Sequence, residues 1–301
     1  MDTHPLFEEI AMFKVENLNV SYGKTNKILS DVSFTLDSGF TFLVGENGSG
    51  KTTLVRGITS NICPTVKISL DGKNLLRADL KRCMSYLPQE FDVYPELKIY
   101  NLLEFVSIAK GISREKRDKQ IRLVAEYTGI SAVFNKKMKN CSVGIRRRVG
   151  IAASLLGDPK VIILDEPTAG IDPKERIHFY GTIKQFFSNK IVLAATHILS
   201  DIENLADYVM MLNHGQISFK GTYSEYSSAL NGKLYILNTC DDTLTEEEKK
   251  FISNGILLSK KKGETGTIYK VALTETTDKA AGRFCSIQPT QEDLWEYNRG
   301  K

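Results

Sequence analysis

The fold of this chain is decided by one stretch, Gly45-Glu46-Asn47-Gly48-Ser49-Gly50-Lys51-Thr52-Thr53. It matches the pattern G-x-x-x-x-G-K-[ST], whose glycines let successive backbone N–H groups turn inward around a phosphate. An apolar, β-prone run precedes the stretch (Phe40–Val44), and a segment able to continue as a helix follows it (Leu54–Ile58). This order presents the positive end of a helix to an anion. We expect Lys51 to reach the β- and γ-phosphates of a nucleotide and the Thr52 hydroxyl to bind Mg²⁺.

Length and composition allow one large α/β domain and a smaller one. Of the 301 residues, 25% are charged and 42% are hydrophobic, which is ordinary for a folded, water-soluble protein. The net charge of +4 is small for this length, so no nucleic-acid partner is expected. No apolar run approaches the ~20 residues that span a bilayer, and a signal peptide's apolar region is missing. We therefore expect a cytoplasmic protein.

The cysteines support the same compartment. They are scattered, with no C-x-x-C pair, which predicts reduced thiols and argues against a disulfide framework or a metal site. The five are Cys63, Cys83, Cys141, Cys240 and Cys285.

The segments before the phosphate loop predict an antiparallel sheet beside the nucleotide. Phe13–Val20 and Ile28–Leu36 alternate apolar and polar residues, as half-buried strands do. Tyr22 follows the first of them and is a candidate for stacking on adenine, with ordinary packing as the alternative.

Two further strands follow the loop. Val66–Leu70 ends at the turn Asp71-Gly72, and Met84–Leu87 stops at Pro88. Gln89 therefore lies at the end of a buried strand, where α/β sheets place ligand-contacting residues. A solvated loop glutamine is the alternative.

From Pro95 to Leu156 the pattern becomes helical. Ser113 can cap a helix whose apolar residues recur at helical spacing up to Gly129. Arg146-Arg147-Arg148 lie on a later helix, and we interpret them as a solvated or ion-paired face and not as a nucleic-acid site.

Two buried strands carry the candidate catalytic groups. Val161–Leu164 is apolar without alternation, as in a parallel sheet, and is followed directly by Asp165 and Glu166. One carboxylate can hold Mg²⁺ while the other polarises the attacking water. A helix is expected over Lys174–Phe187, and Ile191–Thr196 then leads to His197 in the same layer.

The remainder, from about residue 223, follows a closing hairpin and predicts a small α+β domain of order β-α-β-β-α. Lys260-Lys261-Lys262 is expected at a solvated hairpin turn. The expected segments are the closing hairpin (Asp207–Leu212, Gln216–Phe219), strands Leu234–Thr239, Ile256–Lys260 and Thr267–Leu273, and helices Thr245–Asn254, Asp278–Cys285 and Thr290–Tyr297.

In chain order the motifs are Tyr22, Gly45–Thr53, Gln89, Ser142–Gly144, Leu164-Asp165-Glu166, Asp172 and His197. Over roughly residues 13–221 this set resembles the ATP-binding subunit of ABC transporters. The resemblance implies an α/β fold with a RecA-type P-loop core, an antiparallel β subdomain and a helical subdomain at about 95–157. The ATP-binding domain would span 12–222, and an accessory α+β domain 223–301.

The resemblance also implies roles for single residues. Glu166 would be the general base, His197 the switch at the γ-phosphate, and Asp165 a magnesium ligand. Gln89 would touch Mg²⁺, as would Thr52, and would relay movement to a membrane subunit. Tyr22 would stack on adenine, Gly45–Thr53 would hold the phosphates of ATP, and Asp172 would lie in the D-loop.

The signature segment, Cys141-Ser142-Val143-Gly144-Ile145, departs from the family's usual Leu-Ser-Gly-Gly-Gln. Ser142 and Gly144 remain, and the resemblance implies that they contact the γ-phosphate held by an opposing subunit. Exporters similar to the bacitracin-resistance type often carry a bulky third and an apolar fifth residue here. The C-terminal residues 288–295 are also similar to the tail of such export ATPases.

We therefore expect an Mg²⁺-dependent ATPase that forms a head-to-tail homo- or heterodimer and drives separate transmembrane permease subunits. It would lie at the inner face of the membrane and power efflux of a peptide antibiotic or another amphiphile. One alternative is a non-transport ABC ATPase in translation or DNA repair, although such relatives usually carry two ATP domains or a long coiled-coil insertion. The other is a weakly hydrolysing regulatory subunit, suggested by Val143.

Overall fold

The computed structural model describes residues 11–23, 26–60, 62–91, 94–172, 174, 176, 180, 184, 187, 189–239, 243–263, 266–274 and 283–299. The chain divides into two compact units, with the boundary between Ile217 and Ser218. The boundary proposed from the sequence, after residue 222, stays a prediction.

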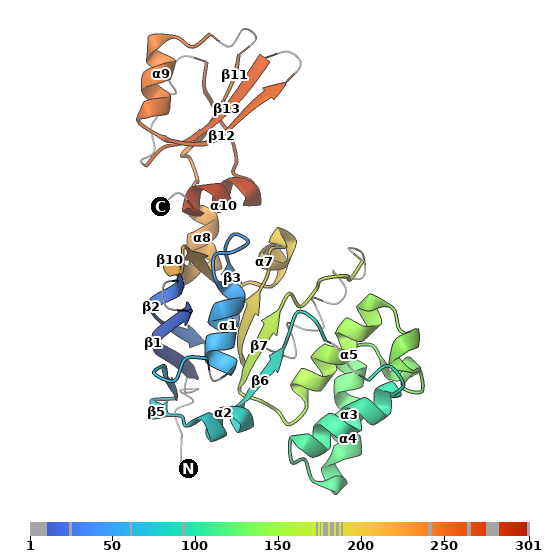
Figure 1. Ribbon diagram of the computed structural model, residues 1–301. Coiled ribbons are helices and arrows are strands. Elements are labelled where there is room, and N and C mark those ends of the chain that lie inside the picture. Colours follow the sequence, from blue (N-terminus) through green and yellow to red (C-terminus); the bar gives the residue numbers. More distant parts are fainter. Residues whose placement is uncertain are drawn as a thin grey trace, which may run out of the picture. The chain divides into compact units, whose positions relative to one another are not determined.

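The centre of the first unit consists of five strands of a six-stranded sheet of order β10-β9-β3-β8-β7-β6 (Figure 1). The sixth strand, β10, begins in the first unit and continues past its last residue. Strands β6, β7, β8, β3 and β9 pair in parallel. The strand bounds are β3 Gly39–Val44, β6 Met84–Leu87, β7 Val161–Asp165, β8 Ile191–Ala195, β9 Tyr208–Asn213 and β10 Gln216–Thr222. All residues of β3, β7 and β8 are buried, which explains why their sequences are apolar without alternation.

A second, antiparallel sheet has the order β2-β1-β4-β5. Its strands are β1 Met12–Tyr22, β2 Asn26–Asp37, β4 Lys67–Leu70 and β5 Lys73–Asn74. The alternation predicted for the first strand is confirmed, since Phe13, Val15, Leu18 and Val20 are buried while their neighbours are not. These side chains share one core with apolar residues of helix α1 (Lys51–Thr59), including Leu54.

The stretch predicted to be helical is confirmed as a helical subdomain. Helices α3, α4 and α5 contact one another, and α5 also packs on β6. Ser113 stands at the cap position of α4, as expected. The bounds are α3 Ile99–Ala109, α4 Arg114–Tyr127, the short turns η1 Ser131–Val133 and η2 Met138–Asn140, and α5 Val143–Leu155. In this unit, the short helices α2 Arg77–Cys83 and α7 Leu199–Leu205 were not expected from the sequence, and neither was α8 Tyr223–Ser228 of the second unit.

The second unit contains a four-stranded sheet of order β12-β13-β11-β14. Tyr235 and Leu237 from this sheet pack against Phe251 of α9 and against Phe284, which gives the unit a core of its own. The predicted capping box of α9 is present between Thr245 and Glu248. The bounds are α8 Tyr223–Ser228, β11 Leu234–Thr239, α9 Glu246–Ser253, β12 Ile256–Gly263, β13 Gly266–Ala272, β14 Cys285–Ser286 and α10 Gln291–Arg299.

Some expectations need correction or fall outside the described residues. Lys260–Lys262 lie within strand β12 and not in its turn, because the strand runs on to Gly263. The helix expected over Asp278–Cys285 falls mostly outside the described part of the chain, and its last residue begins β14. The helix expected over Lys174–Phe187 is also only partly described. Cys240 lies outside the described residues.

Candidate functional site

One cavity gathers most of the residues singled out by the motifs. Its volume is about 530 Å³, and it lies where β3, β6, β7 and β8 end. The lining residues are Tyr22, Ile28, Asn47, Gly48, Gly50, Lys51, Thr52, Thr53, Gln89, Asp165, Glu166 and His197. Ser142 and Gly144 are not among them. A single chain therefore brings together the phosphate loop, the carboxylates, Gln89 and His197, but not the signature segment.

The phosphate loop is closely packed at its first residue, Gly45. A side chain at Gly45 would collide with the carbonyl oxygen of Leu212 and with Oγ of Ser49, so the tight approach of backbone there demands glycine. The Ser49 hydroxyl is buried and has no hydrogen-bond partner within the described structure. These observations fit a nucleotide held at the start of α1.

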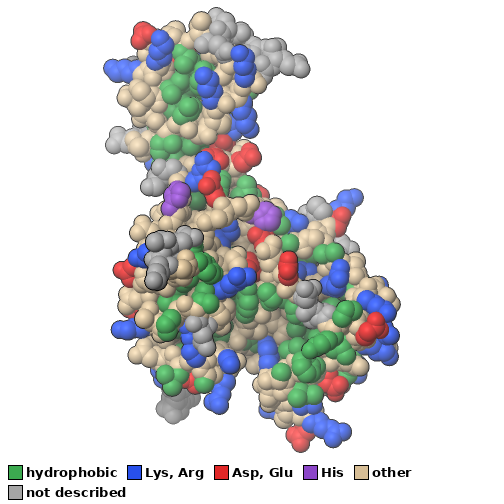
Figure 2. All heavy atoms as spheres, in the orientation of Figure 1, with side chains coloured by type: hydrophobic (Ala, Val, Ile, Leu, Met, Phe, Trp, Pro, Cys, Tyr) green, Lys and Arg blue, Asp and Glu red, His purple; other side chains and the backbone are tan. Residues whose placement is uncertain are grey.

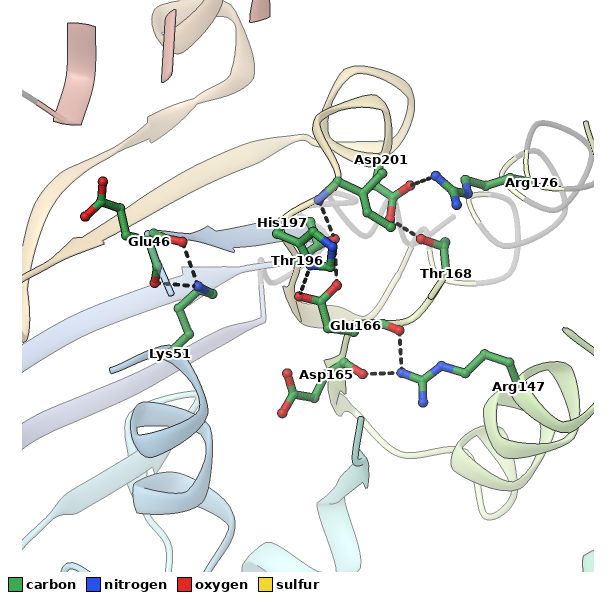
Figure 3. Close-up of polar contacts among 12 residues, drawn as sticks. Glu46, Lys51, Arg147, Asp165, Glu166, Thr168, Arg176, Thr196, His197 and Asp201 are labelled. Carbon is green, nitrogen blue, oxygen red and sulfur yellow. Dashed lines mark hydrogen bonds and ion pairs between the residues drawn. The ribbon is translucent and has the colours of Figure 1, made fainter. Parts of the chain in front are cut away.

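Lys51 begins helix α1 and turns back over the loop (Figure 3). Its Nζ donates hydrogen bonds to the carbonyl oxygens of Gly45 at 2.6 Å and Glu46 at 2.9 Å. Burial lowers the pKa of Lys51, while the nearby Glu166 and Asp165 act in the opposite direction. The ammonium group is thus held against the loop carbonyls and interacts electrostatically with both carboxylates.

The two carboxylates follow one another at the end of β7. Asp165 is almost fully buried, and burial, reinforced by Glu166, raises its pKa. Glu166 has φ +51°, in the left-handed region that costs a non-glycine residue roughly 1–2 kcal/mol. Its N–H donates to the carbonyl oxygen of Ala195 at 2.8 Å, which ties this strained residue to the neighbouring strand end. Strain of this kind is typical of functional positions.

Both carboxylate oxygens of Glu166 are held by residues that follow β8. Nδ1 of His197 lies 2.7 Å from Oε1, and the Thr196 hydroxyl donates to Oε2 at 3.3 Å (Figure 3). Thr196 Oγ1 in turn accepts the N–H of Ile198 at 3.1 Å. The sequence singled out His197 but not Thr196, whose hydroxyl orients the carboxylate from the other side.

A buried cluster around Asp201 was also not predicted from the sequence. The Asp201 side chain is fully buried on α7 and accepts hydrogen bonds from the hydroxyls of Thr168 and Tyr180. Nη1 of Arg176 lies 3.9 Å from Oδ1 of Asp201. Burial raises the pKa of Asp201. The cluster joins the segment after Glu166 to the helix that follows His197.

The interpretation of Arg146–Arg148 as a solvated or ion-paired face is wrong for Arg147, which is only 5% exposed. Its guanidinium lies under two loops, and burial lowers its pKa to about 10. It donates to the carbonyl oxygens of Pro88 at 2.8 Å, Gln89 at 3.1 Å, Glu166 at 2.6 Å, Pro167 at 3.1 Å and Asp165.

The signature segment forms the start of α5. Ser142 caps this helix, with Oγ accepting the N–H of Ile145 at 3.3 Å. Val143 is the first helical residue and is 54% exposed. It is not among the described residues with positive φ. Its side chain lies beside Gly170.

The oxygen groups in the cavity suit a magnesium ion that is shared with phosphates. The Thr52 hydroxyl, the Gln89 amide and the Asp165 carboxylate all line it. Among the residues that the structure describes, no group of three or more His, Cys, Asp and Glu side chains forms a metal site by itself.

None of the described helices is long and apolar enough to cross a membrane.

Comparison with known proteins agrees with this geometry. Residues 29–169 match the family model described as ABC transporter. The linearmycin resistance ATP-binding protein LnrL of Bacillus subtilis is 33% identical over 75% of this chain and 74% of its own length. The lantibiotic transport ATP-binding protein SrtF of Streptococcus pyogenes is 33% identical over 70% of this chain and 91% of its own.

A solved structure gives the same result for the fold. The ATP-binding subunit of an ABC transporter superposes with a TM-score of 0.63 at 26% identity, covering 71% of this chain and 91% of that one. The expected α/β P-loop fold is confirmed, and the alternative of a non-transport ATPase is not favoured. The chain belongs to the ATP-binding subunits of ABC transporters, the ATP-hydrolysing subunits that power transport.

Proposed function

We propose that the cavity binds ATP together with Mg²⁺. Backbone N–H groups of residues 45–53 and the Lys51 ammonium would hold the phosphates, and Tyr22, which is half exposed at the cavity, would stack on adenine. The Thr52 hydroxyl, Asp165 and Gln89 would hold the ion. Bound there, Mg²⁺ would neutralise charge on the phosphate oxygens.

Glu166 is the residue that we propose as general base. Its carboxylate lies at the cavity with both oxygens fixed, one by His197 and one by Thr196. A carboxylate held in this way can accept a proton from a water molecule as that water attacks the γ-phosphate. His197 is 63% exposed at its side chain, which leaves the imidazole free to contact the γ-phosphate while it orients Glu166.

The active unit that we propose is a head-to-tail dimer with a second ATP-binding subunit. Ser142 and Gly144 stand at the exposed start of α5 and do not line the cavity of their own chain. The N-terminus of a helix attracts anions, so in the dimer this end of α5 would face the γ-phosphate held by the opposing subunit. Two ATP molecules would then be enclosed between the subunits.

We further propose that the dimer lies on the cytoplasmic face of the membrane, attached to transmembrane permease subunits. Hydrophobic side chains gather at the surface of the helical subdomain (Figure 2, lower right), and Phe105 and Ile108 of α3 are among the exposed ones. Such a surface suits contact with a permease. Two relatives are named for linearmycin resistance and lantibiotic transport, which favours export of a peptide antibiotic or another amphiphile.

The observation that carries the proposal is the meeting of Lys51, Asp165, Glu166 and His197 at one cavity. The dimer is tested by gel filtration of Glu166→Gln, which should bind ATP without consuming it. With Mg²⁺ and ATP the variant should elute as a dimer, and without ATP as a monomer. Elution as a monomer under both conditions, with ATP bound, would contradict the dimer.

A further inference from the structure

One side chain of α5 connects two loops that carry the proposed chemistry. The guanidinium of Arg147 donates to carbonyl oxygens of residues 88–89, which follow β6, and of residues 165–167, which begin at the last residue of β7. Figure 3 shows it reaching from α5 toward the backbone at Asp165 and Glu166. Each of these acceptors belongs to the main chain, so the arginine holds backbone and not a partner side chain.

Three of the five residues that supply these carbonyls also line the cavity. Gln89, Asp165 and Glu166 each take part in its wall and accept a hydrogen bond from Arg147 on their carbonyl oxygen. Glu166 also has the strained φ of +51°. A residue in that region keeps its conformation only when its surroundings fix it. The 2.6 Å bond from Arg147 to the Glu166 carbonyl is one of the contacts that fix it.

The helix that carries Arg147 begins at the signature segment. Arg147 follows Val143 by one turn of α5, and Ser142 caps the same helix. A rotation or shift of α5 would therefore move the guanidinium and, with it, both loops. An arginine is suited to this task because its planar group has five N–H donors in a fixed arrangement. A lysine has a single nitrogen and cannot span the two loops in the same way.

We propose that Arg147 is a positioning residue through which helix α5 sets the backbone that carries Gln89, Asp165 and Glu166. The proposal rests on the roles proposed above for these three residues. When α5 closes on a nucleotide held by the opposing subunit, Arg147 would shift the backbone of Gln89, Asp165 and Glu166 in its own chain. The groups proposed to bind magnesium and to act as base would therefore move with α5. Arg147 itself does not line the cavity and would not touch ATP.

The test compares Arg147→Lys with the matched control Arg146→Lys, an exposed arginine of the same helix. Three quantities are measured: the Kd for ATP by calorimetry in EDTA and in Mg²⁺, the kcat and KM for hydrolysis, and the thermal unfolding midpoint. We expect Arg147→Lys to bind ATP in EDTA as the wild type does. The increase in ATP affinity that Mg²⁺ gives the wild type should be mostly lost in this variant. Its kcat should fall about tenfold, which corresponds to roughly 1.4 kcal/mol in the activation free energy. Arg146→Lys should match the wild type.

Two results would overturn the proposal. One is an Arg147→Lys protein with wild-type kcat and Mg²⁺ response. The other is a lower unfolding midpoint with an unchanged Mg²⁺ response and kcat, which is what a purely structural role predicts. If Arg147→Lys does not fold, Arg147→Gln, which leaves no buried charge, is measured in the same way. Absence of hydrolysis in the wild type would overturn the proposed function, whereas equal behaviour of Arg147→Lys and wild type overturns only this role of Arg147.

Discussion

Nδ1 of His197 lies 2.7 Å from Oε1 of Glu166, although the two residues are 31 positions apart in the sequence. The two side chains meet because β7 and β8 are parallel neighbours, so that their carboxyl ends fall at the same edge of the sheet. The carboxylate is thereby held in one orientation toward the cavity.

His197→Ala should lower ATP turnover strongly while ATP binding is kept. Without the imidazole, Glu166 keeps only the Thr196 hydroxyl as a side-chain partner among the contacts described above, and a misplaced base loses much of its effect. We expect kcat to fall about 100-fold, within the range for a positioned acid–base group. Steady-state hydrolysis and calorimetric ATP binding are the measurements. Thr196→Val, which removes only the weaker contact, should cost less; a larger loss than in His197→Ala would contradict this account.

Gly170→Ala should destabilise the first unit. Gly170 has φ +76°, and a Cβ there would collide with Cγ1 of Val143. The left-handed backbone alone costs alanine roughly 1–2 kcal/mol, and the collision adds to it. Val143→Ala removes Cγ1, so the double variant should recover part of the loss, a coupling of about 0.5 kcal/mol or more. Urea unfolding followed by circular dichroism measures the free energy of unfolding of each single variant and of the double variant. If the two losses simply add in the double variant, the two side chains do not contact each other.

The second unit should lose stability in acid because of Glu248. A hydrogen bond from Arg283, followed by the N–H of Thr245, lowers the pKa of Glu248 from 4.5 to about 2. A lowered carboxyl pKa contributes stability above pH 4.5, and this contribution is lost as the pH falls from 4.5 toward 2. Trp295 is the only tryptophan and lies on α10, so its fluorescence reports unfolding of this unit.

The control for this prediction is the neighbouring Glu247, which is exposed. Glu248→Gln should flatten the dependence of the free energy of unfolding on pH between 5 and about 2. Glu247→Gln should keep it. An unchanged acid dependence in Glu248→Gln would show that other groups cause it.

Much of the site could be predicted because its signals are local. The phosphate loop needs glycines, a lysine and a threonine at fixed spacing, and β7 and β8 need runs of apolar residues before Asp165 and His197. Each of these patterns lies within one strand, loop or helix. Parallel pairing then brings the strand ends together without further information from the sequence.

The parts that could not be predicted depend on contacts between distant segments. Three consecutive arginines look alike in a sequence, and only the packing of α5 on β6 decides that Arg147 is the buried one. Asp201, Thr168 and Tyr180 likewise come from three separate segments with no shared pattern. Lys260–Lys262 resemble a solvated turn, yet β12 continues through them because β13 pairs with each in register.

We propose that Glu166 acts as the base for ATP hydrolysis, and steady-state turnover of Glu166→Gln tests this role most directly. The amide keeps the size and one acceptor of the carboxylate but cannot take a proton from water. We expect Glu166→Gln to bind Mg-ATP as the wild type does and to lose about 100-fold or more in kcat. Lys51→Ala, by contrast, should lose ATP affinity because the phosphates lose a charged partner. Wild-type turnover by purified Glu166→Gln would contradict the account.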